Sequence, residues 1–161
     1  MKKIISIFSL VMVFVLGSCI EQNYPIWEGF EVEFQDAVVR NPAAGETFPR
    51  IAVVNTVGTV NLQVNLVGAH RASDETLTYR IVEDKTTAVA GTHYNTPGSF
   101  VIPAGTSFGT VPVEIINYGP GTGTVDITLE LVGSDAIPAS ANYNRVQIRV
   151  SRPAPAAAPA G

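Results

Sequence analysis

The amino-acid sequence predicts an all-β fold, a sandwich of two sheets built from seven to eight antiparallel strands. Six segments alternate apolar and polar residues, and a period of two places one set of side chains on a core and the other in water. Segments rich in Gly and Pro separate these strands, and no segment has the apolar period of an amphipathic helix. The predicted strands cover residues 30–35, 51–54, 60–66, 77–81, 100–102, 111–115, 125–131 and 145–150.

The first predicted strand shows the pattern clearly, because Phe30, Val32 and Phe34 alternate with Glu31 and Glu33. The apolar set is expected to face the core. The two glutamates are expected to face solvent, where charge protects a sheet from association. The same alternation defines the segments 60–66, 77–81, 111–115, 125–131 and 145–150.

Two shorter strands, 51–54 and 100–102, are apolar runs that turn residues bound on both sides. The segment 111–115 carries Pro112 on its polar side. Because proline cannot donate a hydrogen bond to a ladder, this strand is expected at a sheet edge or at a bulge.

Residues 1–18 predict a lipoprotein signal peptide. Lys2 and Lys3 precede an apolar run over 4–16 that is too short for a transmembrane helix. The run ends in the letters LGSC, which resemble a bacterial lipobox and imply cleavage before Cys19 and acylation of its thiol. An ordinary signal peptide that ends near a cysteine is the alternative. Cys19 is the only cysteine of the chain, so no disulfide is expected.

Three regions are predicted after the signal peptide. Residues 19–29 form a tether, residues 30–150 a single domain, and residues 151–161 a disordered Ala/Pro tail that cannot bury enough apolar surface to fold. Two roles fit Trp27 in the tether: an aromatic platform for a ligand, or a side chain that packs the tether onto the first strand.

The charge of the chain argues against a nucleic-acid partner. The sequence has 10 Lys and Arg and 14 Asp and Glu, and the signal peptide removes two lysines, which leaves a formal net charge of −6. Binding a phosphate backbone requires a basic surface. The expected partner is instead the lipid bilayer, reached through acylated Cys19. We therefore expect an outer-membrane lipoprotein of the cell envelope, with its domain periplasmic or surface-exposed.

The order of residues 83–116 resembles the Calx-beta family. The letters AGTHY (90–94) match the family's loop, FVIPAG (100–105) its turn, and residues 110–116 its following strand. The resemblance covers roughly residues 36–150, and together with the lipobox it is also similar to small uncharacterised lipoproteins common in Bacteroidota. It implies an immunoglobulin-like Greek-key β-sandwich.

Many Calx-beta domains bind calcium through clustered carboxylates, and the resemblance implies where these would stand. His93 takes the place of the family's loop aspartate, and a segment that begins with Asn117 and Tyr118 takes the place of its acidic run. Calcium needs six to eight oxygen ligands, and imidazole suits a hard cation poorly. We therefore expect no metal and no cofactor. A weak calcium site at Glu83 and Asp84 is the alternative.

Catalytic residues are not predicted, and the chain is expected not to be an enzyme. A base for a serine or threonine nucleophile could come from His70 near Asp74, or from His93 near Asp84. The sequence contains neither a strand–turn–helix nucleophile elbow nor a Gly-x-Ser-x-Gly motif. A zinc site would need three or four ligands, which no spacing supplies.

Surface recognition is the function that remains. Exposed aromatic residues can stack on a ligand or anchor a partner, and the candidate binding surface is Tyr118, Tyr143 and Trp27. The alternative is that such tyrosines close the ends of the sandwich, which we expect of Tyr94. The sequence thus favours a non-catalytic binding or adhesion module, or an accessory subunit of a surface complex, with a protein or glycan partner. A structural spacer and a glycan-binding component of a nutrient-uptake system are the other hypotheses.

Overall fold

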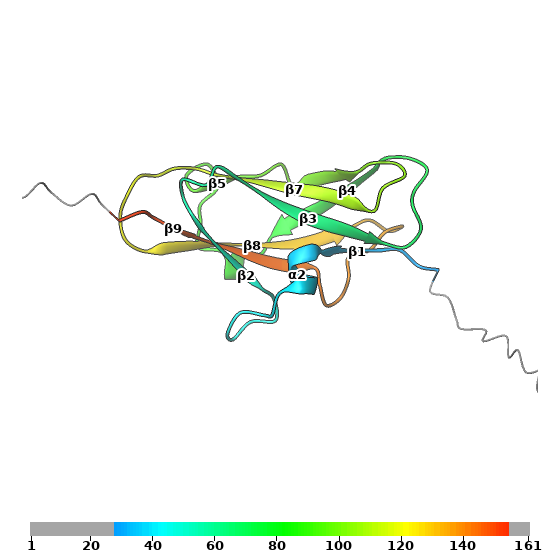
Figure 1. The fold of residues 1–161 in the computed structure, drawn as a ribbon, viewed down its shortest axis with the longest axis horizontal. Coiled ribbons are helices and arrows are strands. Elements are labelled where there is room, and N and C mark those ends of the chain that lie inside the picture. Colours follow the sequence, from blue (N-terminus) through cyan, green and yellow to red (C-terminus); the bar gives the residue numbers. More distant parts are fainter. Residues whose placement is uncertain (1–27, 155–161) are drawn as a thin grey trace, which may run out of the picture.

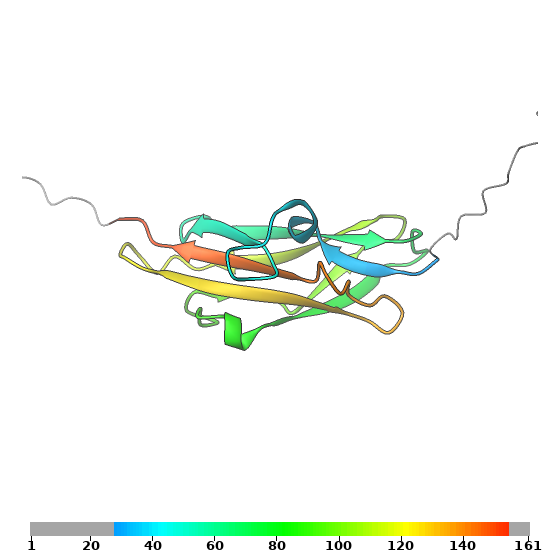
Figure 2. The same cartoon turned by 90° about the horizontal axis from the view of Figure 1, so that it is seen from below.

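Two β-sheets packed face to face make up the structure, a computed structural model that describes residues 28–154. Sheet A has four strands in the order β1-β3-β7-β5, and sheet B has five in the order β2-β9-β8-β4-β6. Figures 1 and 2 show the two layers and the short helix beside them. The strands are β1 (Glu31–Phe34), β2 (Arg50–Val54), β3 (Thr59–Val67), β4 (Glu75–Ile81), β5 (Tyr94–Asn95), β6 (Ser99–Ile102), β7 (Phe108–Ile115), β8 (Thr124–Gly133) and β9 (Arg145–Ser151). The helix α2 spans Gln35–Val39, and the 3-10 helix η1 spans Glu83–Lys85.

The predicted all-β sandwich is confirmed, with two differences in detail. Residues 28–154 form nine strands, and β2 runs parallel to β9 while the other pairs of strands are antiparallel. The extra strand, β5, has two residues, which is too short to show a period. The helix α2 has five residues and escapes detection for the same reason. It lies between β1 in sheet A and β2 at the edge of sheet B.

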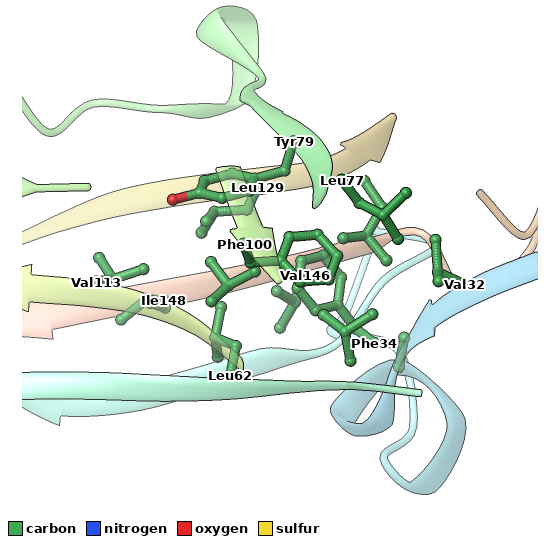
Figure 3. Packing of buried hydrophobic residues seen from close by; sticks show 14 of the residues in the cluster. Val32, Phe34, Leu62, Leu77, Tyr79, Phe100, Val113, Leu129, Val146 and Ile148 are labelled. Atoms are coloured by element: carbon green, nitrogen blue, oxygen red, sulfur yellow. The ribbon is translucent and has the colours of Figure 1, made fainter. Parts of the chain in front are cut away.

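The core lies between the sheets and is built from the apolar sets that the alternation predicts. In β1, Val32 and Phe34 are fully buried while Glu31 and Glu33 face outward. Central strands of both sheets contribute further side chains, which interdigitate in Figure 3. Fully burying one such aliphatic or aromatic side chain stabilises the fold by about 1.5–3 kcal/mol. The buried cluster includes Leu62, Leu77, Val111, Val113, Ile127, Leu129, Val146 and Ile148.

Pro112 lies where its missing N–H costs no ladder bond. The Ile115 N–H donates to the carbonyl of Gly58 at 2.8 Å, and ladder bonds alternate along an antiparallel pair. Pro112 is opposite Asn61 in this register, so its nitrogen points away from β3. On that side its carbonyl accepts a bond from Thr96 Oγ1 at 3.0 Å, beyond the end of β5. The predicted edge position therefore holds over this part of β7.

The free side of β1 is covered by the segment that joins β8 to β9. Val32 N–H donates to Pro138 O at 3.0 Å, Ser140 N–H donates to Val32 O at 2.9 Å, and Phe34 N–H donates to Tyr143 O at 2.9 Å. This segment ties the edge of sheet A to sheet B and closes one side of the sandwich.

The outer face of sheet B is a ladder of ion pairs. Both nitrogens of the Arg149 fork bond the Asp126 carboxylate at 2.7 Å, and this hydrogen bond raises the pKa of Arg149. Glu130 accepts from Arg145 at 2.8 Å and from Arg80 at 3.0 Å. Most of the outward charge of this face is therefore paired within the face.

Ordered structure continues three residues past the predicted boundary between domain and tail at residue 150. Ser151 belongs to β9, and the carbonyl of Pro153 accepts from the Gly121 N–H at 3.0 Å. Composition favoured a tail here, but backbone bonds to a distant loop order residues 151–153. Residues 155–161, the signal peptide, Cys19 and Trp27 lie outside the described residues.

The described chain begins at one end of the long axis of the sandwich and ends at the other (Figure 1). Within residues 28–154, no helix has the length and apolar character to cross a membrane.

Candidate functional site

The positions linked to calcium by the family resemblance come together at one end of the sandwich. We call this region the loop end and define it as residues 89–93, 116–123 and 151–153. The rings of His93 and Tyr118 meet edge to face, with centroids 4.7 Å apart and planes at 87°. Two separate loops are therefore joined by His93 and Tyr118, which the Calx-beta resemblance places at the calcium positions of that family.

His93 is used to build its own turn. Its Nδ1 accepts the N–H of Val89 at 2.9 Å, and its backbone N–H donates to the carbonyl of Val89 at 2.8 Å. Its own carbonyl accepts from the Ile116 N–H at 2.9 Å. Because Nδ1 is an acceptor here, the ring carries its proton on Nε2 in the neutral form. The imidazole therefore holds this loop against the next one.

A guanidinium occupies the centre of the loop end. Arg152 donates to the carbonyls of Gly119 at 3.1 Å, Tyr118 at 3.4 Å and Pro120 at 2.5 Å. It also lies over the Tyr118 ring, 5.3 Å from the centroid. Fully buried Asn55 adds a donor, because its Nδ2 bonds Gly119 O at 3.0 Å. The positive charge that faces these carbonyls is therefore supplied by a side chain of the protein itself, Arg152.

Tyr118 has little free surface in this arrangement. Its hydroxyl oxygen is buried, one ring face lies against Arg152, and the ring packs on the core. Asn117 makes a local turn, in which its Oδ1 accepts the Gly119 N–H at 3.0 Å. The loop end is therefore organised mainly by contacts within the chain.

The structure separates Tyr143 from Tyr118. Tyr143 precedes β9, whereas the Tyr118 loop contacts Arg152 just after β9 ends, so the two tyrosines flank opposite ends of that strand. Tyr143 is 41% exposed. Trp27, the third predicted member of the binding surface, lies outside the described residues. Tyr118 and Tyr143 thus cannot form one continuous surface.

Glu83 and Asp84 line a shallow depression together with Arg80 and Arg145. The positive charges of these two guanidinium groups disfavour the binding of a calcium ion at this place. Across the described residues, no group of three or more His, Cys, Asp or Glu side chains is arranged to hold a metal ion. The absence of a calcium site stays a prediction.

One member of each histidine and acid pair considered from the sequence has another partner. Asp74 Oδ1 accepts the Ala104 N–H at 2.8 Å and so stabilises the turn after β6. Nδ1 of His93 is bound to Val89, as described above. These carboxylate and imidazole groups act as turn-forming groups.

Tyr94 packs into the core as predicted, at 5% exposure. Burial raises the pKa of its hydroxyl above the ordinary value near 10. The folded state then holds this proton more tightly than the unfolded state does. Stability is therefore unaffected below the unfolded pKa and falls as the pH rises through the folded one.

We expect Tyr94→Phe to remove part of the alkaline loss of stability. Urea unfolding at successive pH values from neutral to above the tyrosine pKa measures this loss. Tyr143→Phe, at an exposed tyrosine, is the control and should leave the pH profile unchanged. Equal alkaline profiles for Tyr94→Phe and the unmodified protein would contradict the prediction.

Sequence reasoning missed Arg152 and Asn55. Arg152 falls in the Ala/Pro-rich segment, and its acceptors are backbone carbonyls, which leave no trace in side-chain patterns. Asn55 follows an apolar run and reads as an ordinary turn residue. A buried polar residue of this kind can be identified only when its partner on another loop is known.

Comparison with known proteins assigns the chain to a family. The family model described as "Domain of unknown function (DUF4843)" matches residues 47–159. The chain belongs to the DUF4843 family. The DUF4843 match begins just before β2 and continues past β9, so β1 and α2 precede it. Among curated proteins, none is similar to this chain in sequence.

Solved structures show that this DUF4843 domain has a Calx-beta-like fold. It is similar to the apo form of the Calx CBD1 domain, with a TM-score of 0.57 and 15% identity over 77% of this chain and 97% of that one. The Calx CBD2 domain gives a TM-score of 0.57 and 12% identity over 79% and 91%. A protein of unknown function from Bacteroides ovatus gives 0.50 and 16% over 74% of this chain and 43% of that one. The predicted resemblance to Calx-beta is confirmed for the fold.

Proposed function

We propose that this chain is a membrane-anchored lipoprotein that carries a non-catalytic binding module in the cell envelope. The observation that carries the proposal is that the described chain begins, within the predicted tether, at one end of the elongated sandwich (Figure 1). An acylated Cys19 would hold that end near the bilayer. Both sheet faces and the far loop end would then be open to a partner.

The fold and the loop end support binding over catalysis. One structure of similar fold is named a calcium binding domain, CBD12 of CALX1.1. In this chain Arg152 donates to the carbonyls of residues 118–120, and His93 is bound into its own turn. The domain therefore offers surfaces for recognition, either as an adhesion module or as an accessory subunit of a surface complex.

A structural spacer is the second candidate. The described chain enters at one end of the sandwich and leaves at the other, as a rigid connector would (Figure 1). A spacer would keep its role when the outer faces of its sheets are altered. A binding module would lose its role when the face that meets the ligand is altered.

Acylation of Cys19 is the first test. In cells fed an alkyne-bearing palmitate, we expect the full chain to be labelled and to partition with the outer membrane. Cys19→Ala should lose both the label and the membrane fraction, while Ser9→Ala in the apolar run should keep them. Protease treatment of intact cells then shows on which side of the outer membrane the domain lies. An unlabelled full chain that is released as a water-soluble protein would overturn the anchoring proposal.

A further inference from the structure

The outer face of sheet A carries an unusual run of carboxamides. The outward positions of β3 include Asn61, Gln63 and Asn65 in succession, and Asn61 and Gln63 are exposed. Asn is depleted in strands, because strands favour β-branched and aromatic residues. If only the stability of the strand mattered, Thr or Val would be expected at such positions. The residues of this face are therefore poorly explained by folding alone.

The side chains of Gln63 and Asn65 form an oriented network with residues that precede them in the chain. Gln63 Nε2 donates to Asn65 Oδ1 at 2.9 Å, and Asn65 Nδ2 donates to Gln35 Oε1 at 2.6 Å and to Glu33 Oε1 at 3.3 Å. A carboxamide has two donor hydrogens and an acceptor oxygen with two lone pairs. Bonds within the network use only part of this capacity. The remaining donors and acceptors lie side by side along the strand.

Apolar surface borders this polar strip at both ends. Phe108 lies directly opposite Asn65 and is 59% exposed. At the other end, a shallow depression is lined by Thr59, Asn95, Thr96, Pro97, Pro112 and Glu114. Within it, Asn95 Nδ2 bonds Glu114 Oε2 at 3.0 Å. Phe108 and Glu114 are the outward ends of β7, and strand geometry separates them by about 20 Å.

The charge of the face selects the kind of ligand. The outward positions of β1, β3, β5 and β7 include Glu31, Glu33 and Glu114 but no Lys or Arg. In sheet B, by contrast, acids are paired with arginines. Unpaired carboxylates repel anionic polymers and accept bonds from neutral hydroxyl groups. A protein partner would need a cluster of large apolar side chains at its centre, and the centre of this face has carboxamides instead.

We infer that the outer face of sheet A binds a neutral oligosaccharide laid along β3. Sugar hydroxyls would exchange hydrogen bonds with Asn61, Gln63 and the neighbouring acids. The apolar faces of sugar rings would pack on Phe108 at one end and on Pro112 at the other. This inference rests on the proposed binding function and names its ligand class and its surface. It places recognition on sheet A, away from Tyr118 and Tyr143.

Isothermal titration of the full chain, purified in a detergent without a sugar head group, tests the inference. The probes are cellohexaose, xylohexaose, mannohexaose and maltohexaose, with hexagalacturonate as the anionic comparison. We expect at least one neutral hexaose to bind, and hexagalacturonate to bind more weakly or not at all. Phe108→Ala and the double variant Asn61→Ala with Gln63→Ala should each weaken binding by about tenfold or more. Their melting temperatures should stay close to that of the unmodified protein, because these side chains are exposed.

Two matched controls locate the surface. Asn142→Ala removes an exposed carboxamide, and Tyr143→Ala an exposed aromatic, from the segment between β8 and β9. Both should bind the hexaose as the unmodified protein does. The inference is overturned if no neutral hexaose binds, if hexagalacturonate binds best, or if only Tyr143→Ala abolishes binding. Because Cys19 acylation is measured separately in cells, failure here leaves the anchoring proposal intact, and failure of acylation leaves this titration valid.

Discussion

Gly133→Ala is expected to lower the free energy of unfolding by about 3 kcal/mol or more, since backbone strain and overpacking each cost on the order of 1–3 kcal/mol. Gly133 has a φ of +75°, and a Cβ there would lie 2.3 Å from the carbonyl oxygen of Ile137 and 3.0 Å from the Ala139 nitrogen. Both neighbours are backbone atoms. The turn that they form leads into the segment that covers β1, so relief of the clash would disturb that edge.

Gly105→Ala is the matched control for this substitution. Gly105 also has a positive φ, +72°, but a Cβ there would meet no atom within 4 Å. It should therefore cost only the left-handed backbone penalty, about 1 kcal/mol. Urea unfolding of both variants measures the difference between them. Equal losses would show that the turn after β8 yields easily, contrary to the steric argument.

Arg152→Met is expected to lower the free energy of unfolding by about 2 kcal/mol, because hydrogen bonds from a charged group contribute roughly 1.5–3 kcal/mol. Methionine keeps the stem of the side chain but removes the donors to the carbonyls of residues 118–120. Arg152→Lys should recover only part of the loss, because an ammonium cannot reproduce the planar fork. Arg80→Met is the control, because the Arg80 side chain is 63% exposed in its ion pair with Glu130, and it should change the free energy by less than about 1 kcal/mol.

A calcium titration tests whether the positive charge of the loop end comes from Arg152 or from a bound ion. If Arg152 supplies the positive charge of the loop end, millimolar calcium chloride should leave the melting temperature of the unmodified protein unchanged, and chelator should have no effect. A ligand that binds the folded state must raise its stability. A rise of several degrees with calcium would show that an ion site exists despite Arg152.

The strands were predictable wherever one face of a sheet is exposed to solvent, because apolar and polar residues then alternate along the strand. The segment Thr59–Val67 alternates because its even-numbered side chains fill the core and its odd-numbered ones do not. The run Arg50–Val54 has no clean alternation, so the sequence located the strand but could not show that it runs parallel to β9. Strand direction depends on which distant partner is met, and local pattern contains no such information.

The loop end was predictable only in part. The match to the Calx-beta loop correctly placed Tyr94 in the core and brought His93 close to the 117–123 loop. Arg152 was assigned to the tail because Pro and Ala surround it, and three backbone carbonyls far away in sequence decide its position. Tyr118 and Tyr143 look alike as loop aromatics, yet one is packed under Arg152 and the other is exposed. Tertiary contacts distinguish them.

The parallel pairing of β2 with β9 determines when the domain can finish folding during its synthesis. Arg50 and Gln147, which are bonded across this pair, are separated by 97 residues. During synthesis the N-terminus emerges first, so sheet B cannot be completed until β9, its last strand, is available. Pairing between segments that are so far apart in the sequence is slow. Until then β2 has no strand to pair with. The domain should therefore remain open through most of its synthesis and become compact late, in a step that joins its beginning to its end.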